Sequence, residues 1–452
     1  MKRVLVILLL LGLIFVGCDS IGLGGDDGGS DSVDTEVEQQ AEEEAVESIN
    51  TVVNEMSSLD FSDPTAATEE METQMKDLDK SFDDLLSANP DNPVGNLGKA
   101  LTGMAMMSFD EDVQAALPSE LLNSTSRAFS LDFTSTDSFR ALQDRSVSVD
   151  SWIDIIETKV LPQLKVSLDY LDTAIANMGD ETILITSDVA SDYNEAGEIE
   201  IDKSDLYIPK AGLNFLKGAV EFLLTWDYSM VDANGDEVDI AEQYAAGNLT
   251  EEEIMEILLL NIDASSTVAD TSNFLSFYKS DYLTDSKKSF LAVVQAVKDF
   301  DASVQAEEDD QTNDLIPNTD LEIPAAEQTE IEAEIYSNVG IDADITYISD
   351  IAGVIGDIIA GDEVITVETE YVTDPETGAT SSINLVVDIS KLFALDTDDG
   401  LRAFLPELDL ANEEISFPEG YDFSFGGILQ TESGNLTEDE FNGLIMGLMM
   451  MM

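Results

Sequence analysis

The sequence predicts a mainly α protein with a helical-hairpin body and a smaller carboxy-terminal α+β region that contains a β-hairpin. Three observations support this fold class. Apolar residues recur every three or four positions from about residue 37 to 300, an acidic segment with prolines follows, and apolar residues then alternate at every second position after residue 365. These changes predict a helical domain over residues 37–305, an acidic linker over 306–325 and an α+β region over 326–452.

The composition excludes several classes of chemistry. The chain has 452 residues, with 95 Asp and Glu against 19 Lys and Arg, a formal charge of −76, no histidine and one cysteine. A Ser-His-Asp triad, a Cys-His pair, a His-ligated metal, an intrachain disulfide and a cysteine-held iron–sulfur cluster are therefore ruled out. A chain with this much negative charge repels phosphate backbones, and we therefore expect no nucleic-acid partner. Hydrophobic residues make up 44% of the chain, which is enough to build a core.

The amino terminus has the layout of a signal peptide. Lys2 and Arg3 precede an apolar run over residues 4–16, which is too short to span a bilayer comfortably. The run ends in Phe15-Val16-Gly17-Cys18, which resembles the lipobox of bacterial lipoproteins, although Phe15 replaces the usual leucine. The resemblance implies that residues 1–17 are removed and that Cys18 is acylated, with palmitate or a similar chain. The alternative is an ordinary signal peptide with a chance cysteine.

The segment that follows reads as a tether. Residues 18–36 contain the cysteine and a run rich in Gly, Ser and Asp, and such a run has a root-mean-square reach of roughly 25 Å. Anionic headgroups repel an acidic protein, so we expect acylated Cys18 to be what holds it at the lipid bilayer. The lipobox resemblance implies a lipid-anchored protein of the cell envelope, in the outer membrane, on the periplasmic face of the inner membrane or at the cell surface.

The clearest helix runs from Trp152 to Met178, with Pro162 predicting a kink or a helix start within it. Its apolar stripe is Ile153, Ile156, Val160, Leu164, Leu168, Leu171, Ile175 and Met178. Three further helices are predicted from apolar stripes and cap residues. The first follows Pro209 and has the apolar stripe Leu213, Leu216, Val220 and Leu223. The second begins at the capping box Thr250–Glu253 and runs through Leu260. The third follows the cap candidates Thr284 and Asp285 and has the stripe Phe290, Val293, Val294 and Val297.

One stretch of about 40 residues resembles a known repeat family. The spacing of the second helix and closing proline of a tetratricopeptide repeat resembles that of Leu78, Phe82, Leu85 and Pro90. The first helix of a following repeat resembles the segment with Leu97-Gly98, Ala100 and Leu101. The offset after Pro90 differs by about two residues, and the rest of the chain shows no such period. The resemblance implies a repeat-like helical-hairpin body.

The carboxy-terminal region changes period. Ile348, Ile351, Ile355 and Ile358 predict a short helix that ends near Gly361. A β-hairpin then follows around the turn Asp374–Gly378. Its alternating apolar-face residues are Ile365, Val367, Thr369, Tyr371, Ile383, Leu385, Val387 and Ile389. We expect the aromatic segment 423–429 to be extended and to lie on this region.

One acidic loop suggests calcium. Asp232, Asn234 and Asp236 stand at alternate positions and resemble the start of an EF-hand-type loop, in which hard oxygen ligands converge on Ca²⁺. Glu237 replaces the glycine and Gln243 the bidentate glutamate of that pattern. The alternative is a polar turn in an acidic chain.

The remaining motifs favour structure over catalysis. Trp152 and Trp226 lie in helical stripes where core packing is the default, and the glycines within 95–103 indicate close helix packing and no phosphate loop. We find no nucleophile-and-base pair, so no catalytic residues are predicted. The sequence therefore predicts a non-enzymatic structural or protein-binding lipoprotein. The alternatives are a calcium-dependent binding module and a carboxylate-based hydrolase acting on polysaccharide. Acids spread over the whole chain also suggest a halophilic surface.

Overall fold

The computed structural model describes most of the helical body and much of the carboxy-terminal region. The described residues are 64–116, 149–179, 182–186, 198–228, 238, 261–262, 275–306, 323–374, 379–395, 400–404, 407–409, 414–417, 420–431 and 434–451. Within them the protein is mainly helical with a small carboxy-terminal antiparallel sheet, which confirms the predicted fold class.

The chain divides into two compact units, each discontinuous in sequence. Unit 1 contains residues 1–217 and 295–321, and unit 2 contains residues 218–294 and 322–452. Of the three places where the chain passes between units, one falls inside the predicted linker 306–325. The other two fall within helices, so the units do not correspond to one stretch of sequence each.

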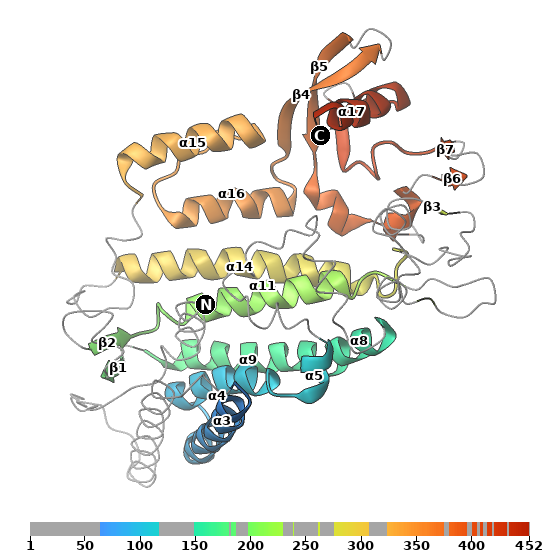
Figure 1. Ribbon diagram of the computed structural model, residues 1–452. Coiled ribbons are helices and arrows are strands. Elements are labelled where there is room, and N and C mark those ends of the chain that lie inside the picture. Colours follow the sequence, from blue (N-terminus) through green and yellow to red (C-terminus); the bar gives the residue numbers. More distant parts are fainter. Residues whose placement is uncertain are drawn as a thin grey trace. The chain divides into compact units, whose positions relative to one another are not determined.

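The described part of unit 1 begins with a helical hairpin formed by α3 (Pro64–Ala88) and α4 (Pro93–Met107), and α4 also packs on α9 (Leu161–Asn177) (Figure 1). The short helix α5 (Glu111–Ala116) lies against α8 (Val149–Ile155). Buried apolar side chains join α3 to α4, and they include Leu78, Phe82, Leu85, Leu97 and Ala100. The residues that carry the tetratricopeptide resemblance thus form an antiparallel helix pair.

The predicted stripe between Trp152 and Met178 is confirmed, because each of its apolar residues is buried. Fully burying such a side chain stabilises the fold by about 1.5–3 kcal/mol. The helix is not uniform: a π-helix over Ile156–Val160 separates α8 from α9, and Pro162 is in the first turn of α9. Proline lacks an amide hydrogen, so it fits a first turn better than a helix interior.

Unit 1 also contains a small antiparallel pair, β1 (Ile183–Thr186) and β2 (Glu198–Ile201), in which Ile183 pairs with Ile201. Two long helices belong partly to this unit: the beginning of α11 (Tyr207–Leu223) and the end of α14 (Asp281–Ala306). Phe300 and Val304 of α14 are buried against Tyr207 and Ile208 of α11.

The predicted apolar stripe of α11 is wrong at one position. Leu213 is buried, but Leu216 is 41% exposed. The buried side includes Asn214, Gly218 and Glu221. Polar residues can occupy a buried helix face when their hydrogen bonds are satisfied, and apolar periodicity does not detect them.

Unit 2 contains α15 (Ala325–Val339), α16 (Ile348–Ala360) and the first part of α14 (Figure 1). Each of α15 and α16 ends at a glycine with positive φ, Gly340 at 72° and Gly361 at 94°. Glycine adopts this left-handed conformation without the steric penalty of a side chain, so both helices stop where the sequence places it.

The sheet of unit 2 has the strand order β4–β5–β8–β9. Its strands are β4 (Ile365–Asp374), β5 (Ala379–Val387), β8 (Leu429–Thr431) and β9 (Gly434–Asn435). The predicted hairpin is confirmed, because β4 and β5 pair antiparallel, with Val367 opposite Leu385. The predicted pattern extended too far at one end, since Ile389 begins a 3₁₀ helix over Ile389–Ala394.

The remaining elements described in unit 2 include short strands, a 3₁₀ helix and the terminal α-helix. A three-stranded sheet contains β3 (Asn261–Ile262), β6 (Glu407–Asp409) and β7 (Glu414–Ser416), and a 3₁₀ helix covers Gly400–Phe404. The terminal helix α17 (Glu438–Met451) packs on β4.

The expectation of an extended aromatic segment at 423–429 is wrong. The chain turns tightly there, because Phe425, Gly426 and Gly427 have φ values of 52°, 70° and 87°. The Asp422 carboxylate accepts hydrogen bonds from the amides of Ser424 and Gly426, which hold the turn. Neighbouring aromatic rings contact one another across this turn, and they are Phe417, Tyr421, Phe423, Phe425 and Phe441.

Candidate interaction site

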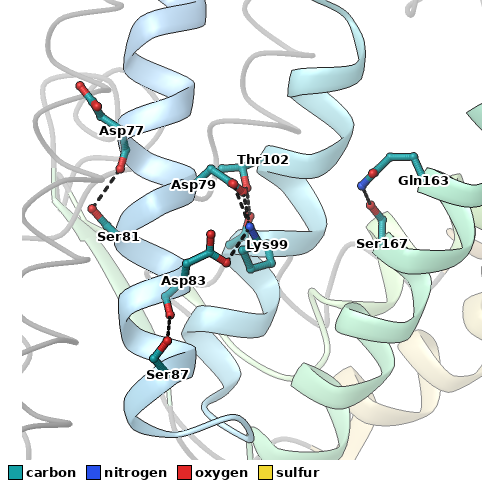
Figure 2. Close-up of polar contacts among 10 residues, drawn as sticks. Asp77, Asp79, Ser81, Asp83, Ser87, Lys99, Thr102, Gln163 and Ser167 are labelled. Atoms are coloured by element: carbon teal, nitrogen blue, oxygen red, sulfur yellow. Dashed lines mark hydrogen bonds and ion pairs between the residues drawn. The ribbon is translucent and has the colours of Figure 1, made fainter. Parts of the chain in front are cut away.

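The α3–α4 hairpin is joined by a compact group of charges. The Lys99 ammonium of α4 donates to both carboxylate oxygens of Asp79 in α3 at 2.8 Å, and it lies 2.9 Å from Asp83 Oδ1 (Figure 2). The Thr102 hydroxyl donates to Asp79 Oδ1 at 2.6 Å. Residues 16 to 23 positions apart in sequence thus meet at one point between the two helices.

The environment of Lys99 favours its charged form. Burial acts to lower the pKa of the ammonium, but the hydrogen bonds to Asp79 and Asp83 outweigh burial, so the pKa of Lys99 lies above its usual value. A nucleophilic lysine needs the opposite shift, because only the neutral amine attacks. The arrangement therefore positions two helices and does not activate an amine.

Two glycines of α4 allow the helices on either side to approach closely. A Cβ atom at Gly98 would lie 2.3 Å from the Phe82 ring of α3, and one at Gly103 would lie 2.3 Å from Gln163 Nε2 of α9. The Gln163 side chain donates to Ser167 Oγ at 3.2 Å on the same helix (Figure 2). The prediction of close helix packing at these glycines is confirmed.

The turn between α3 and α4 is fixed by asparagine side chains. Asn92 is the N-cap of α4 and accepts from the Gly95 amide at 2.9 Å. The Asn96 side-chain amide donates to the carbonyls of Pro90 and Asn92 at 2.9 and 2.8 Å. Both asparagines are buried, so the turn is held by satisfied hydrogen bonds.

A second charge group ties the π-helix to the start of α5. Lys159 donates to Asp110 at 2.8 Å and to Asp112 at 2.5 Å. The hydrogen bond from Lys159 holds the pKa of the Asp110 carboxyl below its usual value. The Asp110 carboxylate also accepts from the Val113 amide at 3.1 Å, so it caps α5 as well.

Unit 2 buries a carboxylate that the sequence did not single out. Glu221 of α11 has no solvent exposure, and Ser289 of α14 donates its hydroxyl to Glu221 Oε2 at 2.7 Å. Ser286 donates to the Gly218 carbonyl at 2.8 Å nearby. The only signal in the sequence is that Glu221 is the one acidic residue of α11, and this did not distinguish it from surface acids.

Apolar side chains remain exposed on α16. Ile348 is 42% exposed and Ile355 is 48% exposed, although both belong to the stripe that predicted this helix. The buried residues of α16 are Ala352, Gly356 and Ile358. The helix thus has an apolar surface larger than its described neighbours cover.

The residues predicted to form functional sites are mostly outside the described part of the chain. Cys18 lies there, and so do Asp232, Asn234 and Asp236 of the predicted calcium loop. Trp152 and Trp226 are described and buried, which confirms the expected core packing. The expected helical position is wrong for Trp226, which follows the end of α11 and forms a β-bridge with Phe277. Within the described ranges, no group of three or more Cys, Asp or Glu residues is arranged to hold a metal ion.

The described helices include none that is long and apolar enough to cross a membrane. Comparison with protein-family models, curated proteins and solved structures finds no match for this chain.

Proposed function

We propose that this protein is a lipid-anchored lipoprotein of the cell envelope and acts as a non-enzymatic scaffold that binds another protein. The anchor is acylated Cys18, the tether is residues 18–36, and the scaffold is the helical body with its carboxy-terminal α+β region.

The observation that carries the scaffold proposal is the joint between α3 and α4. Its charged and polar side chains pair with one another across the two helices, and its glycines bring α3, α4 and α9 into close contact. Groups paired in this way hold helices at fixed positions and leave no reactive atom for chemistry. Stacked helical hairpins of the repeat-like kind are suited to presenting an extended surface to a protein partner.

The lipobox-like residues at Phe15–Cys18 support the anchor. The apolar run has the length of a signal-peptide h-region, and the one cysteine of the chain follows it where cleavage is expected. Two or more acyl chains give stable anchoring, whereas one gives only marginal binding. The anchor is needed because a chain with a formal charge of −76 is repelled by anionic headgroups.

Crosslinking in cells followed by mass spectrometry tests the scaffold. The crosslinkers should include a carboxyl-reactive reagent, because residues 299–390 contain no Lys for an amine-reactive one. We expect the same envelope protein to be recovered in repeated experiments at comparable positions of this chain. Recovery of the chain without any envelope protein would contradict the proposal.

A further inference from the structure

The exposed apolar surface of α16 forms one ridge. Ile348 and Ile355 are seven positions apart, so they lie on the same helix face about 10.5 Å apart along the axis. Ile359 continues this face and is half-buried. Spacing of this kind is what a partner helix recognises when it packs its own apolar face against a helix.

The ridge is held on a firmly fixed helix. At one end the Asp350 carboxylate accepts from the amides of Thr346 and Tyr347 at 2.8 Å each. In the middle, a Cβ atom at Gly356 would lie 2.9 Å from Val294, so α16 and α14 are in close contact there. At the other end Lys287 donates to the Ala360 carbonyl at 3.2 Å. The exposed isoleucines are therefore presented in a defined geometry.

The charges around the ridge indicate the chemistry of its partner. Exposed acids precede α16 at Asp342 and Asp344 and follow it at Asp362 and Glu363. Residues 299–390 contain no Lys or Arg at all. The apolar ridge thus lies between two acidic ends on a stretch of chain that has no Lys or Arg of its own, and Lys287 of α14 is the base that contacts its second end, at the Ala360 carbonyl. A second copy of this chain would bring like charges together, which is unfavourable.

We propose that the α16 ridge docks an amphipathic helix of a partner protein, one whose apolar residues follow a helical spacing and whose ends carry Lys or Arg. The apolar face packs on Ile348 and Ile355, and the basic ends meet the acids at residues 342–344 and 362–363. This inference rests on the proposed scaffold function and names the partner's chemistry at one surface of it.

Fluorescence anisotropy with a labelled synthetic peptide tests the docking. The probe is an 18-residue Leu/Lys peptide with leucines at helical spacing, and the control peptide has the same composition in scrambled order. The proteins are the full chain, the double variant Ile348→Ser with Ile355→Ser, and the matched control Leu216→Ser. Leu216 is 41% exposed and lies on α11, so the control removes a similar apolar side chain elsewhere.

We expect the patterned peptide to bind at 0.15 M NaCl, where long-range surface charge is screened. The double variant should weaken binding at least about tenfold, and Leu216→Ser should change it less than about twofold. The scrambled peptide should bind more weakly than the patterned one. No binding, equal binding of the two peptides, or equal losses in the double variant and the control would each overturn the inference.

The two proposals can fail separately. If crosslinking in cells recovers an envelope protein but the peptide result is negative, the docking surface is wrong and the scaffold function stands. If the peptide binds as expected while no envelope protein is recovered, the ridge binds basic helices and the scaffold function is wrong.

Discussion

Lys99 of α4 donates to both carboxylate oxygens of Asp79 in α3, each at 2.8 Å. The side chain of Lys99 is 13% exposed and that of Asp79 is 28% exposed, so this ion pair is only partly accessible to water. Such a pair contributes more than a surface ion pair, and removal of one partner leaves the other poorly compensated. The pair therefore provides a direct test of how the hairpin is held.

Lys99→Met should destabilise the hairpin by about 1–3 kcal/mol, because Asp79 and Asp83 would then face each other without a counter-charge. Hydrogen-exchange mass spectrometry of α3 and α4 measures this, since local opening is read as faster amide exchange. The matched control is Lys76→Met, which removes an exposed pair with Glu72 on one helix and should cost less than about 0.5 kcal/mol. Equal effects of the two changes would contradict this role for Lys99.

The stability of unit 1 at acid pH should depend on the ionisation of Asp110. The hydrogen bond from Lys159 lowers the pKa of Asp110 in the folded state. The ionised Asp110 carboxylate therefore stabilises the fold at pH values above the pKa of an Asp in the unfolded chain, which is about 4, and this stabilisation is lost as the pH falls. Asp110→Asn retains an oxygen for the α5 cap but removes the charge. The stability difference between wild type and Asp110→Asn, measured by urea unfolding, should therefore shrink as pH falls from about 6 to 2. A difference that grows on acidification would have the wrong sign.

Gly98→Ala should destabilise the hairpin by about 1–3 kcal/mol, because the new methyl group would overlap the buried Phe82 ring. Gly212→Ala is the control, since no atom lies within 4 Å of a Cβ at that position of α11. It should stabilise the protein by about 0.5–1 kcal/mol through helix propensity. A double variant with Phe82→Leu should recover part of the loss, which a double-mutant cycle measures. Full additivity in that cycle would show that the two residues do not meet.

The melting temperature should rise with NaCl concentration. A formal charge of −76 on 452 residues destabilises the compact state through self-repulsion, and added salt screens it. A titration in calorimetry from low salt to about 1 M NaCl measures the effect, with a size-matched protein of balanced charge as the control. A flat or falling response would reject the halophilic-surface hypothesis.

Periodicity predicted the fold best where burial is purely apolar. Between Trp152 and Met178 each residue of the predicted stripe is buried, and the pairing of Val367 with Leu385 follows the two-residue alternation. Pro162 correctly predicted a break in regular α-helix near its position, although the π-helix itself has no distinct sequence signal. These elements could be predicted because a single physical effect, burial of apolar area, determines them.

Sequence reasoning failed where polar groups are buried or apolar groups are exposed. Glu221 is buried and accepts a hydrogen bond from Ser289, a partner that is 68 positions away in the chain. Leu216 and Ile355 fit apolar stripes yet are exposed, because burial depends on whether another element covers them. The charge group at Lys99 was missed for a similar reason, since acids occur throughout this chain and only tertiary structure shows which of them meet a lysine.

The proposed function depends most on the anchor, and cell fractionation with intact-mass analysis of the full chain tests it most directly. We predict that the wild-type protein is found with membranes, begins at Cys18 and carries the added mass of its acyl chains. The Cys18→Ser variant should instead be found in the soluble fraction. An unmodified Cys18, or the same distribution of the two proteins, would contradict the account.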